Sequence, residues 1–412
     1  MTATNLFEQA TDPTVRADPY PIYARMRETP VARQDDGIYV VSTYEEVRSL
    51  LFDSRMSSQV VPKPALAATG NPFIDLILNP IRTHIIHKHR SFVFRDPPDH
   101  DVVRRHVMAQ FTPERLQNIK PLIDETVGAL ISAMRGRERV DLIVDFAYPL
   151  SVAIICALLG VPPEDDRKFE AWSTGLATGG DLLQLDKKAR QKIAADVFAI
   201  SSYLGALIDA KRKRPADDIL TGLATFRDAK AGKLKRFDVI STAVTLLVAG
   251  HETTVGLIAN GMLALLRDQT LLARLRDEPS VAPRLIDEVL RLDPPVQFLR
   301  RKALDDIVLA GVRIPKDAAV ILVIASANRD PKRFENPDAF NLDRKNSQYL
   351  SFGAGLHFCI GSSLARSEAE TALPALAKRL IAPRLVADPP PYRPMAALHG
   401  PKHLIVDIQG VV

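Results

Sequence analysis

Cysteine is scarce in this chain of 412 residues, which contains only Cys156 and Cys359. Two cysteines so far apart do not supply the disulfide framework that stabilises small secreted domains. The N-terminal segment also lacks the pattern of a secretory signal peptide. We therefore expect a reducing, cytoplasmic location, and we exclude disulfide-dependent extracellular scaffolds as a class.

Long apolar runs are also missing. No continuous apolar stretch reaches the roughly 18 residues that a membrane-spanning helix needs. Low-complexity linkers and internal repeats are absent as well. The composition, 46% hydrophobic and 25% charged, is typical of a globular protein. We expect a single domain over residues 1–412 that does not enter a membrane.

The net charge of +5 does not by itself indicate nucleic-acid binding. Basic residues are spread along the chain, and the one dense cluster, residues 211–214, precedes Pro215. A cluster in that position is typical of the solvated C-terminus of a helix. A basic surface of this kind can instead steer an acidic protein partner.

Cys359, unlike Cys156, lies in a segment whose residue pattern is typical of a reactive or metal-binding cysteine. Gly355 precedes Cys359 by four residues and Gly361 follows it by two, and a helical pattern begins near Ile360. Backbone amides and the positive end of a helix dipole favour a thiolate, which is a nucleophile or a metal ligand. By contrast, Cys156 lies in an apolar run and is typical of a buried structural cysteine.

Residues 236–268 predict one long helix. The pattern is apolar on nearly all faces, which indicates a buried helix, yet Gly250, Glu252 and Thr253 lie near its middle. A glycine lowers helix stability, and a buried carboxylate needs a partner. Such a local conflict is typical of a functional site.

Two further pairs have helical spacing. His100 and Arg104 are four residues apart, so a helix places both on one face, which suits an anion or a solvated surface. Glu288 and Arg291 are three residues apart and, taken alone, predict only an ordinary salt bridge.

Taken together, these segments resemble the cytochromes P-450, the haem-thiolate monooxygenases. The family's haem-binding signature, FxxGxHxCxG followed by Leu-Ala-Arg, is matched by Phe352, Gly355, His357, Cys359, Gly361, Leu364, Ala365 and Arg366. Residues 249–254 resemble the family's AGx(D/E)TT segment, 288–291 its ExxR pair and 100–104 its HxxxR pair. The resemblance implies a mainly α fold with a smaller β-region. In that fold a long central helix lies over a haem held by a cysteine loop.

The resemblance also implies a role for each matching residue. Cys359 would be the axial ligand of iron in haem b, and Glu252 and Thr253 would relay protons to dioxygen as the catalytic pair. The expected haem-binding residues are His100, Arg104, Ala249, Gly250, Arg301, Phe352, Gly353, His357, Cys359 and Gly361. The expected substrate contacts are Val248, Ala249, Val296, Phe298, Leu299 and Ala397. The structural network would join Glu288 and Arg291 to Arg344, with Arg329 as the alternative third member.

The activity implied is hydroxylation of an apolar small molecule, such as a terpenoid, fatty acid, steroid-like or aromatic compound. Two electrons would come from a separate ferredoxin or flavodoxin with its NAD(P)H-dependent reductase, since no reductase sequence is fused to this chain. We expect a monomer without a nucleic-acid or membrane partner. The alternatives are a peroxide-using haem-thiolate enzyme, a non-catalytic haem-binding sensor and a cysteine-nucleophile hydrolase. The first two do not need Glu252 and Thr253, and the third needs a base near Cys359.

Overall fold

The computed structural model describes residues 6–60, 91–165, 168, 172, 187–345 and 348–412. These residues form two compact units. The first unit spans 1–56, 118–151 and 251–412, and the second spans 57–117 and 152–250. The single domain expected from the sequence stays a prediction.

Seven helices with described bounds lie wholly in the first unit. They are α1 (Leu6–Ala10), α2 (Tyr20–Met26), α3 (Tyr44–Phe52), α12 (Gln269–Asp277), α13 (Ala282–Leu292), α14 (Ile324–Ala327) and α15 (Ser362–Arg379). In the second unit lie α5 (Asp99–Met108), α9 (Lys187–Lys213) and α10 (Ile219–Thr225). Three helices, α6 (Pro113–Ser132), α7 (Tyr148–Leu159) and α11 (Arg236–Arg267), contribute residues to both units.

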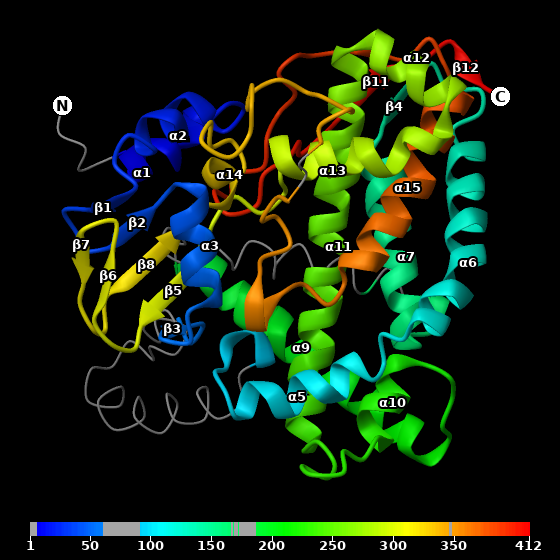
Figure 1. The fold of residues 1–412 in the computed structure, drawn as a ribbon. Coiled ribbons are helices and arrows are strands. Elements are labelled where there is room, and N and C mark those ends of the chain that lie inside the picture. Colours follow the sequence, from blue (N-terminus) through cyan, green and yellow to red (C-terminus); the bar gives the residue numbers. More distant parts are fainter. Residues whose placement is uncertain (1–5, 61–90, 166–167, 169–171, 173–186, 346–347) are drawn as a thin grey trace. The chain divides into compact units, whose positions relative to one another are not determined.

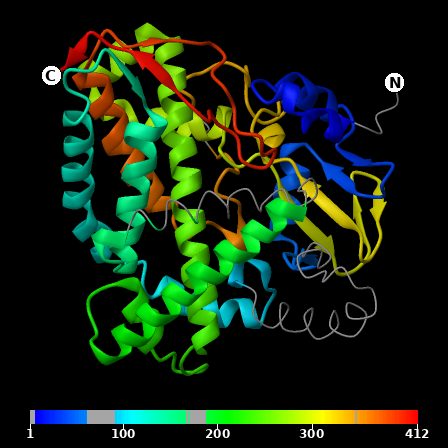
Figure 2. The same ribbon diagram turned by 180° about the vertical axis from the view of Figure 1, so that it is seen from behind.

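The main sheet has the strand order β1-β2-β8-β5-β3. Its strands are β1 (Val31–Arg33), β2 (Tyr39–Val41), β8 (Ala319–Leu322), β5 (Leu299–Ala303) and β3 (Met56–Ser57). The pair β2 and β8 is parallel, whereas β1 with β2 and β5 with β8 are antiparallel. In both views the blue N-terminal strands lie beside the yellow C-terminal strands (Figures 1 and 2).

Smaller sheets complete the β-structure. β6 (Ile307–Leu309) pairs with β7 (Val312–Ile314), and β12 (Gly410–Val411) pairs with β9 (Leu380–Ile381). A third sheet has the order β10 (Arg384–Leu385), β11 (Ile405–Asp407) and β4 (Arg139–Asp141).

The neighbouring strands β2 and β8 are buried on both faces of the main sheet. Val41 and Leu322 pack in one cluster with α3, whereas their neighbours Val40 and Ile321 pack in another with α1 and α2. This division follows from the two-residue side-chain period of a strand. Continuous apolar strands of this kind are typical of a sheet covered on both sides.

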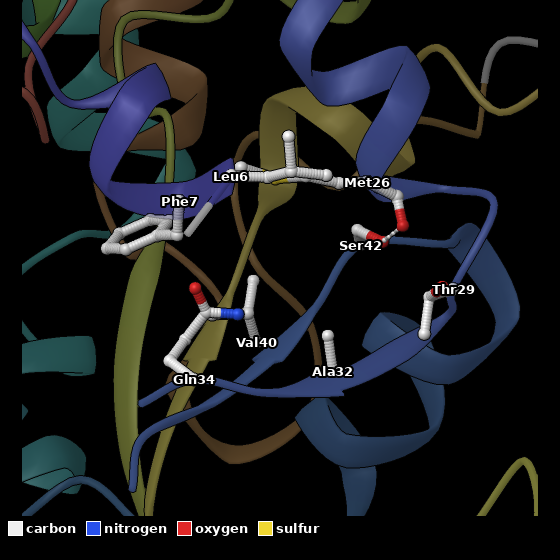
Figure 3. Close-up of a pocket in the computed structure, with 8 residues that line it drawn as sticks. All are labelled: Leu6, Phe7, Met26, Thr29, Ala32, Gln34, Val40 and Ser42. Carbon is white, nitrogen blue, oxygen red and sulfur yellow. Dashed lines mark hydrogen bonds between the residues drawn. The ribbon is translucent and has the colours of Figure 1, made fainter. Parts of the chain in front are cut away.

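Figure 3 shows a small cavity on the α1 and α2 side of that sheet. Leu6, Met26 and Val40 are among its lining residues, and Ser42 Oγ donates to Met26 O at 3.0 Å. The cavity measures about 10 Å³. That volume is close to the minimum for one water molecule, so this cavity belongs to the packing of the sheet.

The helix predicted over 236–268 is observed as α11, Arg236–Arg267. At about 1.5 Å per residue its 32 residues extend about 48 Å. Two stretches among the described residues are long and apolar enough to cross a membrane, 191–213 and 236–267. The second is 61% buried within the protein, as expected of a core helix.

A carboxyl group is buried on α15. Glu368 is 1% exposed, and burial raises its pKa well above the ordinary value, while Ser151 Oγ lowers it only in part. The folded protein therefore holds a proton that the unfolded chain releases at neutral pH.

We predict that Glu368→Gln stabilises the protein near neutral pH. The bound proton stabilises the folded state fully below the unfolded pKa, and that contribution is lost as pH rises toward the raised folded pKa. Urea unfolding should show a gain of about 1–3 kcal/mol at about pH 8 and little change at about pH 4.

The matched control is Glu125→Gln, which alters an exposed glutamate on α6. Equal unfolding free energies for wild type and Glu368→Gln at both pH values would contradict a protonated buried carboxyl.

Candidate active site

The cysteine loop, residues 350–361, is a tight backbone turn in the first unit. A 3₁₀ turn occupies Gly355–His357, and the amide of Cys359 donates to Phe352 O at 2.9 Å. Gly353 and Gly355 have φ of +69° and +64°. Only glycine adopts these values readily, so the glycines found in the sequence are required by the turn.

Gly355 is also required by packing. A Cβ at this position would lie 2.6 Å from Leu51 O on α3. Gly361 is less constrained, since its Cβ would lie 4.0 Å from Cys359 Sγ, at ordinary contact distance. The loop is therefore seated on α3, with the half-buried thiol of Cys359 held beside the start of α15.

The surroundings of Cys359 fit one axial bond to a haem iron. Among the described residues, no group of three or more His, Cys, Asp or Glu could hold a metal ion. A zinc site would need three or four such ligands, whereas a porphyrin brings four of its own. Phe352 and Phe358, with ring centroids 6.4 Å apart, give the loop an apolar character.

The acid and alcohol predicted to act together lie on α11 in the first unit. Glu252 is 7% exposed and Thr253 is half-buried. One turn earlier, in the second unit, Ala249 is exposed although most of this helix is buried. Ala249 and Thr253 share a helix face by their four-residue spacing, and that face is the more open one.

Gly250 has a packing role in the second unit. A Cβ there would lie 2.9 Å from Ile155 Cδ1 on α7, closer than real Cβ contacts. The glycine that weakens the helix is thus explained by the close approach of two helices, and its predicted haem contact stays a prediction.

Glu252 is held by two cationic or donor groups. Arg393 Nη1 donates to Oε2 of Glu252, and His251 Nε2 lies 3.3 Å from Oε1. Burial raises the pKa of Glu252, but His251 and Arg393 together outweigh that effect and lower it below the ordinary value. The carboxyl is therefore ionised at neutral pH despite being buried.

His100 and Arg104 lie on α5 in the second unit. His100 is fully buried, its Nδ1 lies 2.8 Å from Asp101 Oδ1 and its ring is 6.3 Å from Phe92. Arg104 is half-buried one turn later, on the same helix face. Their propionate contact stays a prediction.

The remaining predicted contacts in the first unit lie on or near β5. Arg301 is half-buried on that strand, and Nη1 donates to Arg300 O at 2.8 Å. Val296 forms a bridge with Leu398, next to Ala397. Phe298 is 4% exposed and packs edge-on against Phe7, at a centroid distance of 5.1 Å.

Other predicted positions also have described surroundings. Leu299 is partly buried against the α3 side of the sheet, and Val248 is half-buried on α11. Substrate contact by Val248, Ala249, Val296, Phe298, Leu299 and Ala397 stays a prediction. A cavity of about 510 Å³ lies elsewhere in the first unit, beside Asn260, Arg267 and Tyr392, and none of the predicted catalytic, haem-binding or substrate-contact residues lines it.

Glu288 binds two arginines. Arg291 Nε and Nη2 each donate to the Glu288 carboxylate at 2.8 Å, and Arg344 Nε lies 3.2 Å from both oxygens. The third partner is thus Arg344. Arg329 instead donates to Leu292 O at 2.8 Å.

The network continues to the cysteine loop through Asn328. Arg291 Nη1 donates to Asn328 O at 3.0 Å, and Asn328 Oδ1 accepts from the amide of Leu350 at 2.7 Å. Asn328 Nδ2 donates to Ser351 Oγ at 2.8 Å. The loop therefore begins from a position fixed by α13.

Sequence reasoning missed Arg393, the counter-ion of Glu252. It lies 141 residues away along the chain. A single arginine in an irregular C-terminal segment has no periodic pattern, so the sequence contained no signal for this contact.

A comparison with family models identifies the class of protein. The model described as "Cytochrome P450" matches residues 56–405 of this chain. The chain therefore belongs to the cytochrome P450 family and has its fold. It is an oxidoreductase of the monooxygenase type, and its cofactor is haem b bound through a cysteine thiolate.

Three similar proteins place the chain among bacterial members. Cytochrome P450 107B1 of Saccharopolyspora erythraea is 36% identical over 397 residues, which cover 93% of each chain. Vitamin D(3) 25-hydroxylase of Pseudonocardia autotrophica is 35% identical and covers 86% of this chain and 85% of the relative. The ligand-free structure of CYP164A2 from Mycobacterium smegmatis is 36% identical, with a TM-score of 0.86, over 98% and 100% of the two chains.

We predict that Glu288→Gln destabilises the protein more than Arg344→Met. The first change leaves two nearly buried arginines without their carboxylate, which costs about 3–5 kcal/mol. The second leaves the Glu288–Arg291 pair balanced and removes only charged hydrogen bonds, worth about 1.5–3 kcal/mol. Urea unfolding of the haem-loaded protein measures both values.

The control is Arg284→Met. Arg284 lies on α13, as Glu288 does, and the change removes its exposed ion pair with Asp343. Its cost should stay below about 1 kcal/mol. If Glu288→Gln cost no more than this control, the network would not stabilise the fold.

Proposed function

We propose that this chain is a monooxygenase that hydroxylates an apolar small molecule with dioxygen and two electrons from a separate redox partner. The observation that carries the proposal is Glu252, a buried and ionised carboxylate next to Thr253 in the middle of α11. A haem used only for sensing needs no such pair. We further propose a cytoplasmic monomer.

In this proposal haem b would supply the oxygen-activating chemistry, and Cys359 Sγ would bind its iron. Ala249, Gly250, Arg301, Phe352, Gly353, His357 and Gly361 would hold the porphyrin, with His100 and Arg104 at its propionates. Thr253 Oγ1 would pass a proton inward, and a carboxylate oxygen of Glu252 would accept its replacement from solvent. The apolar side chains proposed as substrate contacts would exclude water.

The substrate class rests on the same side chains. The proposed contacts carry no charge, so they suit a terpenoid, fatty acid, steroid-like or aromatic compound and offer no partner to a highly charged one. A vitamin D(3) hydroxylase among the relatives supports a largely apolar substrate. A shift of the haem Soret band on adding one compound of each class identifies the class that binds.

The first functional prediction concerns the proposed proton relay through Glu252 and Thr253. With a plant-type ferredoxin, its reductase and NADPH, Thr253→Ala and Glu252→Gln should lower product formed per NADPH consumed by about 10- to 100-fold. Thr253→Ser, which keeps a hydroxyl at this position, should retain most of the wild-type yield of product per NADPH consumed. Product is measured by mass spectrometry, after each variant shows the thiolate-type absorption of its reduced carbon monoxide complex.

The control is Thr371→Ala, whose hydroxyl only donates to Ser367 O within α15. Turnover with hydrogen peroxide alone, and none with dioxygen and reductant, would favour a peroxygenase. Unchanged coupling in Thr253→Ala and Glu252→Gln would contradict their catalytic role.

We propose that the redox partner binds beside the cysteine loop. Leu356 and Phe358 of the loop are 47% and 44% exposed, and Phe52 at the end of α3 is 59% exposed. Arg48 lies over the Phe52 ring at 5.3 Å. This apolar surface with a basic side chain suits an acidic ferredoxin or flavodoxin. We include Arg366 in this proposed face, and its guanidinium also donates to Tyr349 and Asp287.

We predict that Arg48→Glu slows reduction by ferredoxin about tenfold at low ionic strength, because it reverses an exposed charge on the docking face. Stopped-flow formation of the carbon monoxide complex measures the rate. Substrate binding, read from the Soret shift, should not change. Arg135→Glu, an exposed reversal at the end of α6, is the control. Equal reduction rates for Arg48→Glu and wild type would place the partner elsewhere.

A further inference from the structure

The C-terminal loop, residues 391–401, folds back on itself. The amide of Arg393 donates to Gly400 O at 3.2 Å, Tyr392 forms a bridge with Pro401, and the amide of Lys402 donates to Pro391 O at 2.7 Å. These contacts fix the backbone that carries the Arg393 side chain.

Two small or polar residues of α11 let this loop approach the helix. A Cβ at Gly256 would lie 3.0 Å from Pro295 Cβ and at the ordinary contact distance of 3.5 Å from His399 O, and a Cβ at Gly400 would lie 3.1 Å from Asn260 Oδ1 and 3.7 Å from Gly256 Cα. Gly256 and Asn260 follow Glu252 by one and two helical turns, so all three share a helix face. The approach that brings the loop to the helix thus also brings Arg393 to Glu252.

A half-buried carboxylate, Asp293, anchors the far side of the loop. His399 Nε2 lies 3.0 Å from Asp293 Oδ1, and Tyr20 Oη donates to the same oxygen. Burial raises the pKa of Asp293, but His399, Tyr20 and Arg329 outweigh this and lower it to about 2. The anchor is therefore charged throughout the neutral range.

The same loop carries a proposed substrate contact. The amide of Gln297 donates to Ala397 O at 3.0 Å, and the amide of His399 donates to Pro295 O at 2.8 Å. Val296, the second proposed substrate contact of this region, forms a bridge with Leu398 between these two bonds. One short loop thus joins the counter-ion of Glu252 to the turn at Ala397.

We propose that Arg393 is a positioning residue that fixes the carboxylate of Glu252 and couples it to the substrate-contacting turn of the C-terminal loop. The catalytic meaning of this coupling rests on the proposed function. Glu252 is faced by His251 from its own helix and by Arg393 from the loop, and Tyr148 packs edge-on against His251 at 5.6 Å. Of these groups, only Arg393 comes from the loop that holds Ala397.

A double-mutant cycle on the ferric, haem-loaded chain tests the coupling. Amide hydrogen exchange is measured for wild type, Glu252→Gln, Arg393→Met and the double variant. The amides of Gln297 and His399 should exchange about tenfold faster in each single variant, because the loop loses its ion pair with α11 and keeps only the long bond of 3.5 Å from Asn260 Nδ2 to His399 O. The double variant should be no faster than either single variant, and the Leu350 amide should not change.

Arg139→Met is the matched control. It removes the exposed ion pair with Asp407, which follows the loop, but does not alter Glu252. Its Gln297 and His399 amides should exchange as in wild type. Additive effects of Glu252→Gln and Arg393→Met, or wild-type exchange in both, would overturn the proposal.

Infrared spectra report the pKa of Glu252. That pKa would not change if Arg393 only stabilised the loop and did not act on the carboxylate. The band of protonated Glu252, identified by its loss in Glu252→Gln, should appear at higher pH in Arg393→Met, because removal of the guanidinium raises the pKa of that carboxyl. Arg393→Lys should restore most of the wild-type titration. A pKa of Glu252 that is unchanged in Arg393→Met would overturn the positioning role.

Neither measurement involves turnover. If the proposed monooxygenation fails while the cycle shows coupling, the positioning role stands and the catalytic role of Glu252 falls. If turnover succeeds and the cycle shows additivity, the proposed monooxygenation stands and the positioning role of Arg393 falls.

Discussion

The carboxylate of Glu288 is the interaction on which the site depends. It neutralises Arg291, which is fully buried, and also binds Arg344. An arginine without a counter-ion in that position would cost several kcal/mol, so the three side chains are stable only together. Because Arg291 also binds Asn328 O, and Asn328 binds Leu350 and Ser351, this ionic cluster fixes the start of the cysteine loop.

A similar arrangement recurs on α11 and in the C-terminal loop. Glu252 is buried and Asp293 is half-buried, and each carboxylate is kept ionised by partners from distant parts of the sequence. Glu368 has no cationic partner among its described neighbours and keeps its proton instead. Burial disfavours the charged form of each of these carboxyl groups. A carboxyl group with a cationic partner stays ionised, and one without such a partner keeps its proton.

Much of the fold was predictable from the sequence. The apolar pattern over 236–268 predicted α11 to within one residue, because a helix buried on all sides has an unmistakable composition. Gly355 and Gly361 indicated a tight turn around Cys359, and of these two Gly355 has the positive φ that requires glycine, whereas Gly361 does not. Family motifs supplied the haem and the monooxygenase class, which spacing alone left open between a ligand and a nucleophile.

What the sequence did not predict depends on long-range contacts. The family resemblance already favoured Arg344 over Arg329 as the third member of the Glu288 network, and only the fold excludes Arg329, which donates to Leu292 O. The contact between Arg393 and Glu252, by contrast, required the close approach of the C-terminal loop to Gly256 and Asn260. That contact has no period or motif, since it joins side chains that a linear pattern cannot relate.

The parallel pairing of β2 with β8 has a consequence for biosynthesis. Tyr39 on β2 lies opposite Val320 on β8. β2 therefore cannot pair with β8 until most of the chain has left the ribosome. At typical rates of translation this delay is roughly tens of seconds. During that time Val40 and Val41 remain without the central strand of their sheet, so the edge of β2 that later pairs with β8 stays unpaired.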